Sequence, residues 1–264
     1  VSDDGSAVIL GVFPDPDLLS HQRPDSGPCR DVAGRVVDSL LPSPAASRIP
    51  IAAITGTNGK TTTSRMVAHI LQQTGRNVGL ACTDGIYLNG ELVRRGDLAG
   101  YSGALGVLSN PRTEVAVLET ARGGMATMGI AFDHCDVGAC LNVARDHLGT
   151  DGIVTIDQMA LHKQQVIERS RAAAVLNAED PRCLAMAEAS PADDIVLVSG
   201  DPQHPAVAAH CRNGGTAVVR DRRDDGDWIV MVTGTEQQPL VTTADIPATR
   251  GGRADNNVQN APIT

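Results

Sequence analysis

The sequence predicts an α/β protein with a P-loop-type, mostly parallel sheet flanked by helices, and with an antiparallel hairpin at one edge of the sheet. Three observations support this prediction. Short apolar runs alternate with amphipathic helical patterns from about residue 49 onward. A glycine-rich turn follows the first of these runs and opens a helix. Near the C-terminal end, two apolar runs flank an Asp-Asp-Gly-Asp turn.

The first 45 residues are expected to form a tail and linker ahead of one domain. They contain a passage rich in Pro, Asp and Ser, followed by the stretch "VAGRVVDSLL" at 32–41, for which a helix is predicted. Three prolines in "PSPAASRIP" then break both helix and strand. The sequence therefore predicts a boundary near residue 46 and a single nucleotide-binding domain over 46–264.

Within that domain the strands are predicted from continuous apolar runs. Strands of this kind are buried on both faces, which favours a parallel sheet covered by helices on both sides. A helix is predicted at 61–74, with apolar residues on one face. The predicted core strands are 49–55, 77–82, 115–118, 137–141, 173–176 and 195–198, and the predicted hairpin strands are 216–220 and 228–232.

Composition limits the classes of partner. The 264 residues carry a formal net charge of −9 and only 2% aromatic side chains, which argues against nucleic acid. No apolar run approaches the roughly 18 residues of a membrane span, and the first residues are acidic, unlike a signal peptide. A cytoplasmic protein without a membrane partner is expected. Six cysteines without a C-x-x-C pair are expected to be buried, reduced thiols.

The stretch "ITGTNGKTTT" at 54–63 has the chemistry of a phosphate-binding loop. Its glycines let backbone N–H groups turn toward an anion, the helix N-terminus adds a positive dipole, and Lys60 adds a full charge. Ile54 stands where the longer P-loop pattern has its first glycine, so the match is to a shortened variant. ATP and Mg²⁺ are the predicted ligands, and the predicted contacts are Gly56, Thr57, Asn58, Gly59, Lys60, Thr61 and Thr62, with Thr61 also at the metal.

The stretch "TGTNGKTTT" resembles the signature of the Mur ligase superfamily, the ATP-dependent enzymes that join amino acids to carboxylates. Four further motifs resemble blocks of that family in the same order: "AVLETARGGM", "DVGACLNVARDHLG", "VLNAEDP" and "GGRADNNVQNA". The stretches "RDVAGRVVDSLLP" and "TDGIYLNGELVRRGD" are similar to the cyanophycin synthetase subgroup. The resemblance implies that a carboxylate is phosphorylated and then attacked by an amine. In that subgroup, arginine is joined to the aspartate side chains of cyanophycin.

The same resemblance implies roles for individual residues. Glu119, Thr83 and His147 match positions at or near the two magnesium ions of the family. Lys163 aligns with the lysine that Mur ligases carbamylate to obtain an extra anionic oxygen ligand, and Arg122 is expected to hold the acceptor carboxylate. Read without the family, each of these residues also fits an ordinary strand end or helix surface. Lys60, Lys163 and Arg122 form the predicted catalytic set.

Four further residues are expected to hold the nucleotide: Asn142, Asn177, Asp180 and Asn257. Asn177 and Asp180 also fit a plain turn after a strand. Asn256 and Asn257 stand where the family commonly has His-Asn, so the nucleotide contact is expected to differ there.

Mur ligases continue into a C-terminal domain, which this sequence is expected to lack, and residues 1–29 resemble the end of the ATP-grasp domain of cyanophycin synthetases. Three functions therefore stay open at this point: the cyanophycin-type ligase, a Mur-type ligase of a cell-wall or folate-like acceptor, and an inactive nucleotide-binding module. A homo-oligomer or a partner domain would complete the site in the last case.

Overall fold

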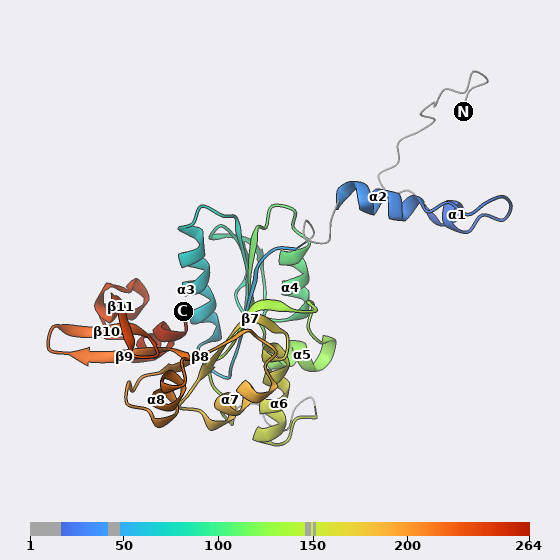
Figure 1. Ribbon diagram of the computed structural model, residues 1–264. Coiled ribbons are helices and arrows are strands. Elements are labelled where there is room, and N and C mark those ends of the chain that lie inside the picture. The colour runs from blue at the N-terminus through green and yellow to red at the C-terminus, as the bar shows by residue number, and fades with distance from the viewer. Residues whose placement is uncertain (1–16, 42–47, 146–148, 150–151) are drawn as a thin grey trace. The chain divides into compact units, whose positions relative to one another are not determined.

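The computed structural model describes residues 17–41, 48–145, 149 and 152–264 (Figure 1). The chain divides into two compact units, Val1–Arg48 and Ile49–Thr264. The prediction that the first 45 residues are a tail ahead of one domain is not tested by this division and stays a prediction.

The first unit contains two helices, α1 (Leu19–Gln22) and α2 (Val32–Leu40). The backbone N–H of Gly34 donates to the side chain of Asp31 at 2.8 Å, which caps the start of α2. The helix predicted at 32–41 is thus confirmed.

The second unit contains one mixed sheet, in which the described residues form eleven strands in the order β11-β10-β9-β8-β7-β6-β1-β5-β2-β3-β4. Neighbouring strands from β9 to β2 are parallel, and the pairs at both edges are antiparallel. The strands are β1 (Ile51–Thr55), β2 (Val78–Cys82), β3 (Gly85–Leu88), β4 (Glu91–Arg95), β5 (Val115–Glu119), β6 (Cys135–Cys140), β7 (Ser170–Asn177), β8 (Asp194–Ser199), β9 (Thr216–Arg223), β10 (Gly226–Thr233) and β11 (Glu236–Thr242).

The predicted fold class is confirmed. Every predicted core strand is present, and the predicted hairpin forms as β9 and β10. Two features were not predicted: β11 extends this hairpin, and β3 and β4 add a second antiparallel edge.

Helices cover both faces of the sheet (Figure 1). Ile54 of β1 packs in the cluster that contains Ala68 of α3, whereas its neighbour Ala53 packs in the cluster that contains Val107 of α4. Since successive strand residues point to opposite faces, α3 and α4 lie on opposite sides. The helices of this unit are α3 (Lys60–Gln72), α4 (Tyr101–Leu108), α5 (Arg122–Met128), α6 (Ile156–Ile167), α7 (Pro181–Ala185), α8 (Pro205–Arg212) and α9 (Asp255–Asn260).

The cysteines are free, and five are buried as predicted, whereas Cys29 is exposed. The Sγ atoms of Cys140 and Cys183 lie 3.4 Å apart inside the core. In the described part of the chain, no helix combines the length and apolarity that a membrane span needs.

Candidate active site

The turn between β1 and α3 depends on two glycines. Gly59 precedes the first residue of α3 with φ +88°, and a Cβ atom there would lie 2.5 Å from the Asn260 side chain. A Cβ atom at Gly56, where φ is +150°, would lie 2.9 Å from Leu141. At both positions φ is positive and the neighbouring atoms leave no room for a Cβ atom, so only glycine fits there. The loop is therefore a tight backbone cradle at the end of the sheet.

Asn142 holds this loop in place. Its Oδ1 accepts hydrogen bonds from the N–H groups of Thr57 (3.0 Å) and Asn58 (2.9 Å), and its Nδ2 donates to the Asn58 carbonyl (3.1 Å). The Thr57 hydroxyl accepts from the N–H of Ala144 at 2.9 Å. Asn142 thus orients the loop that the sequence predicts to hold phosphate. Its own contact with nucleotide stays a prediction.

The start of α3 provides positive potential. No side chain of the described residues caps this helix, so the N–H groups of its first turn carry an uncompensated partial positive charge. The Lys60 ammonium curls back over the loop and donates to the Thr57 carbonyl at 2.9 Å. The combination suits a phosphate group.

A buried carboxylate lies beside the loop. Glu119 ends β5 and is 2% exposed; its Oε2 accepts from the Thr61 hydroxyl at 2.8 Å and its Oε1 accepts from the Thr83 hydroxyl at 3.0 Å. The three residues meet because β5 lies between β1 and β2, and each side chain follows the carboxyl end of its strand. Three of the four predicted metal residues are thus together.

The oxygen atoms of this trio fit Mg²⁺, a hard cation that prefers oxygen ligands and keeps several waters. Among the described residues, no group of three or more His, Cys, Asp or Glu side chains could hold a metal by itself. A bound phosphate would therefore supply the remaining ligands. The fourth predicted residue, His147, lies outside the described residues.

The predicted catalytic residues line one polar cavity of about 260 Å³. Lys60, Arg122 and Lys163 contribute its cationic groups, and Thr83 and Asp97 also line it. Lys60 and Lys163 are the two lysines of the sequence, which otherwise uses arginine for every basic side chain except histidine. Both sites where the chain uses a compact primary amine are therefore in this cavity.

Lys163 is 2% exposed and lies on the inner face of α6, beside Met159 and Val166. The pKa of its ammonium group is lowered to about 8, chiefly by burial; the positive charges of Lys60 and Arg122 also lower this pKa, whereas Cys140 and Cys183 raise it. A neutral amine is thus available on this side chain near neutral to mildly alkaline pH.

A second cavity of about 130 Å³ lies on the other side of the loop. Asn142, Asn177 and Asn260 line it, together with Glu179 and Arg220. Asn177 donates from Nδ2 to the Leu141 carbonyl at 2.9 Å.

Asp180 and Asn257, two of the residues predicted to hold the nucleotide, do not line this cavity, and their side chains form hydrogen bonds with backbone groups. The Asp180 carboxylate accepts from the N–H groups of Val143 (2.6 Å) and Arg182 (2.9 Å). The Asn257 side chain donates to the Ala248 carbonyl at 2.7 Å.

Asn260 was not predicted, although it lies against Gly59 and lines the second cavity. It follows Asn257 by three residues on α9, and residues three apart are neighbours on a helix surface. This spacing places Asn257 and Asn260, both in the "NNVQN" motif, on one side of α9, but the sequence does not indicate which of them lies against the loop.

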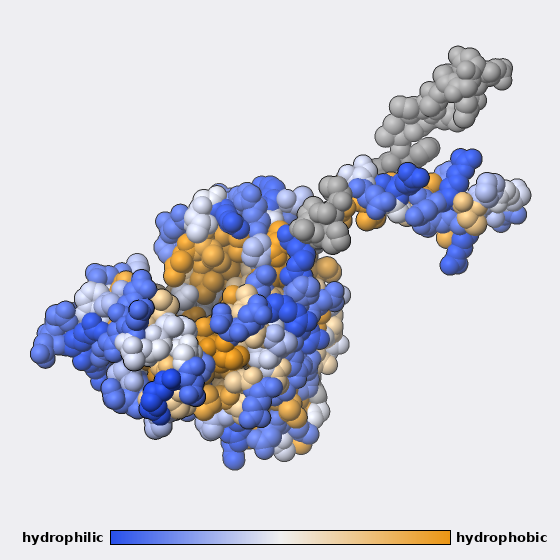
Figure 2. Space-filling model, viewed as in Figure 1, coloured by the Kyte–Doolittle hydropathy of each residue, from blue (hydrophilic) through white to orange (hydrophobic). Residues whose placement is uncertain are grey.

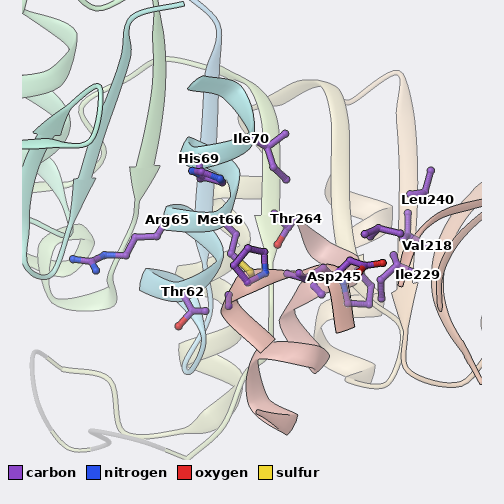
Figure 3. A pocket seen from close by; sticks show the side chains of 16 residues that line it. Thr62, Arg65, Met66, His69, Ile70, Val218, Ile229, Leu240, Asp245 and Thr264 are labelled. Carbon is purple, nitrogen blue, oxygen red and sulfur yellow. The ribbon is translucent and has the colours of Figure 1, made fainter. Parts of the chain in front are cut away.

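An apolar groove of about 870 Å³, larger than either polar cavity, lies beside α3 (Figure 3). Met66 and Ile70 of α3 line one side, and Val218, Ile229 and Leu240 of the β9–β11 sheet edge line the other. Figure 2 shows hydrophobic surface gathered over α3 and beside the β9–β11 lobe. Of the predicted site residues, only Thr62 lines this groove, so the polar chemistry lies in the two smaller cavities.

The sequence matches the Mur ligase middle domain over residues 54–222. The chain belongs to the Mur ligase family. Among its curated relatives, the cyanophycin synthetase of Synechocystis sp. is 45% identical over 262 residues, which is 97% of this chain and 29% of that protein. The cyanophycin synthetase of Crocosphaera subtropica is 44% identical and covers 98% of this chain. The chain thus spans less than a third of the length of these relatives, 29% in both cases.

Solved structures agree with the Mur ligase fold. A UDP-N-acetylmuramoyl-L-alanyl-D-glutamate–2,6-diaminopimelate ligase superposes with a TM-score of 0.56 at 19% identity, covering 87% of this chain and 48% of that one. A bifunctional folylpolyglutamate synthase/dihydrofolate synthase, solved with Mn, AMPPNP and L-glutamate bound, gives 0.50 at 19% identity over 87% of this chain and 59% of that one. The subgroup resemblance to cyanophycin synthetases that the sequence indicated is confirmed by the curated relatives.

Proposed function

We propose that this Mur ligase domain binds ATP and Mg²⁺, transfers the γ-phosphoryl group to a carboxylate, and promotes attack of an amino-acid amine on the resulting acyl phosphate. The observation that carries the proposal is the convergence of Lys60, Glu119 and Lys163 with the glycine-rich loop at one end of the sheet. This set can bind a triphosphate and a carboxylate together, and it contains no side chain placed as a covalent nucleophile. Phosphoryl transfer of this kind depends on positioning and charge neutralisation.

The two cavities divide the nucleotide between them. The loop and the first turn of α3 take the phosphates, with Lys60 free to leave the Thr57 carbonyl for a stronger anionic partner. The nucleoside lies in the second cavity beside Asn177 and Asn260, whose amide groups can both donate and accept. Asn142 lines the second cavity and hydrogen-bonds to Thr57 and Asn58 of the loop, so it links the two parts of the site.

Mg²⁺ would be held by Glu119, Thr61 and Thr83 and would neutralise charge on the transferring phosphoryl group. Lys163 is proposed to carry a carbamate, formed when its neutral amine attacks CO₂ and loses one proton. This reaction needs the lowered pKa that burial provides. The product is an anionic oxygen group in a cavity whose two cationic side chains are then Lys60 and Arg122, and Arg122 is proposed to orient the acceptor carboxylate.

Carbamylation can be tested directly because the sequence contains only two lysines. In ¹³C-bicarbonate, the protein should show a carbamate carbonyl resonance that disappears in Lys163→Met and persists in Lys60→Met, while any resonance from the α-amino group stays in both variants. If every resonance of the wild type survives in Lys163→Met, the assignment is wrong.

The proposed substrates are arginine and the aspartate side chains of cyanophycin. Support comes from the curated relatives, which are named cyanophycin synthetases and match nearly the whole of this chain. Those proteins are more than three times as long as this chain, so the proposal concerns the ATP-dependent ligation step alone.

The test is phosphate release by the purified chain with ATP, Mg²⁺, arginine and a short cyanophycin primer, with each component omitted in turn. We expect release that depends on both arginine and primer and that falls at least about 100-fold in Lys60→Ala. Arg76→Ala, which removes an exposed cation just after α3, is the matched control and should leave the rate unchanged. ATP binding without release above the Lys60→Ala rate would instead favour a nucleotide-binding module that needs a partner domain.

A further inference from the structure

Asp97 is an acidic residue in a cavity otherwise rich in cations. It lines the 260 Å³ cavity with Lys60, Arg122 and Lys163. Triphosphate and acceptor carboxylate are both anions, and a fixed carboxylate close to them disfavours their binding. A positively charged group on a substrate would offset this unfavourable interaction.

Asp97 is exposed at the cavity, and the backbone that follows it is firmly packed. Leu98 and Ala99 are 9% and 6% exposed, and the N–H of Leu98 donates to the Cys82 carbonyl at 3.2 Å. A Cβ atom on Gly103 of α4 would lie 1.8 Å from the Leu98 carbonyl oxygen, so α4 packs directly on this segment. The loop is a fixed wall of the cavity.

The Asp97 loop also contacts the start of α5, where Arg122 lies. A Cβ atom on Gly124 would lie 2.9 Å from the Cα atom of Gly100, and one on Gly100 would lie 3.0 Å from the Cα atom of Gly124. The two backbones thus touch through glycines. Because of this contact, the anion Asp97 and the cation Arg122 lie on adjoining walls of one cavity. Such an arrangement suits a substrate that carries both a positive and a negative group.

The Asp97 carboxylate retains acceptor capacity. Within the described residues its one hydrogen bond comes from the N–H of Ala99 to Oδ1 at 3.3 Å, and no ion pair satisfies it. A carboxylate can accept about four hydrogen bonds. Most of its capacity is therefore available for a ligand.

We infer that Asp97 binds a cationic nitrogen of the substrate, an ammonium or guanidinium group, and so positions the amine and carboxylate that are joined. This inference rests on the proposed ligase function. Two sources could supply the cation: the free amino acid, and the arginine side chains already carried by the acceptor chain. The chemistry is the same in both cases, and Asp97 acts as a positioning and specificity residue.

The test measures equilibrium binding by calorimetry to the full chain with AMPPNP and Mg²⁺ present. The probes are L-arginine, L-citrulline as its neutral isostere, and a cyanophycin primer. Asp97→Asn should weaken binding of L-arginine or of the primer about tenfold, as expected for loss of a charge-assisted hydrogen bond. The affected probe identifies the source of the cation. A lost preference for arginine over citrulline would identify the guanidinium group as the bound cation.

Glu91→Gln is the matched control, because Glu91 is an exposed acid on β4, outside the cavity, and its substitution changes net charge equally. Affinity for AMPPNP and Mg²⁺ should be unchanged in both variants, which separates this inference from the proposed nucleotide chemistry. Equal binding of arginine and primer by the wild type and Asp97→Asn would overturn the inference, as would a weakened Mg²⁺ affinity in Asp97→Asn, since that would make Asp97 a metal ligand. No binding of either probe by the wild type would also overturn it.

Discussion

Lys163 shows how burial of a single amine sets both chemistry and stability. Its ammonium group, 2% exposed, has a pKa of about 8 in the folded protein against 10.5 for an exposed lysine. At pH values between these two, the unfolded chain binds a proton that the folded chain has released, so stability rises with pH across this window. Below about pH 8 the folded protein bears the full cost of the buried charge.

Lys163→Met should therefore raise the free energy of unfolding at pH 7 by roughly 2 to 3 kcal/mol in CO₂-free buffer, since it replaces a buried cation with an apolar side chain of similar length. The gain should shrink as pH rises from 8 to 10. Urea unfolding at pH 7 and pH 9.5 measures both effects. Lys60→Met, at the half-buried first position of α3, is the control, and a pH-independent gain in Lys163→Met would contradict the explanation.

Glu119 is the residue on which the proposed metal site depends. Its carboxylate accepts from the hydroxyls of Thr61 and Thr83 and from the N–H of Thr83. Glu119→Gln keeps the shape but removes the charge, so phosphate release should fall at least about 100-fold and the Mg²⁺ concentration for half-maximal release should rise. Thermal unfolding without ligands tests whether the fold survives. A rate loss with unchanged Mg²⁺ dependence would remove Glu119 from the metal site.

At the scale of elements, the contact between the Gly96–Gly100 loop and α5 is the one that shapes the polar cavity. Gly124→Ala would place a Cβ atom 2.9 Å from the Cα atom of Gly100, which forces the two backbones apart. We expect a loss of about 1 to 3 kcal/mol in unfolding free energy, in the range of overpacked sites. Arginine- and primer-dependent release should fall as well, because the cavity walls separate.

Gly123→Ala supplies the matched control on the same helix. A Cβ atom at Gly123 meets nothing within 4 Å, and alanine favours a helix by about 0.5 to 1 kcal/mol over glycine. Urea unfolding should therefore show Gly123→Ala as neutral or stabilised. Equal destabilisation by both substitutions would mean that helix geometry, and not the loop contact, limits this site.

Buried elements could be predicted from the sequence, and edge elements less well. The core strands appear as continuous apolar runs because helices cover both of their faces, and 115–118 differs from β5 by one residue. The β3–β4 hairpin was missed although Asn89 and Gly90 carry φ +50° and +83°, the conformation that an Asn-Gly turn typically supplies. Its outer strand β4 is mostly exposed and lacks an apolar run, so only the turn signalled it.

The candidate site divides in the same way. Glu119 could be predicted to lie near the loop because it closes a buried strand, and strand ends meet at one edge of the sheet. Asn260 and Asp97 could not, since their approach to the site depends on how α9 and the loop before α4 pack in three dimensions. Local patterns contain no information on such packing.

At the scale of the whole molecule, the described hydrophobic core belongs to one unit. All three buried clusters consist of residues from Ile49 onward, and so do both polar cavities. In the first unit the apolar residues of α2, including Val37 and Leu40, are 53% and 73% exposed. Stability and nucleotide binding are therefore expected to reside in 49–264.

Removal of residues 1–48 should consequently leave the urea midpoint and the affinity for AMPPNP within twofold of those of the full chain, because no described core or site residue is lost. The stabilisation by nucleotide should also be retained, at about 2.7 kcal/mol with nucleotide at 100 times its Kd. Urea unfolding of both chains with and without AMPPNP and Mg²⁺ measures the midpoints and the stabilisation, and titration calorimetry measures the affinity for AMPPNP. A lower midpoint with unchanged nucleotide affinity would show that the first unit stabilises the second through contacts away from the site. Loss of nucleotide affinity itself would mean that residues before 49 complete the binding site, and the assignment of the site to one unit would be wrong.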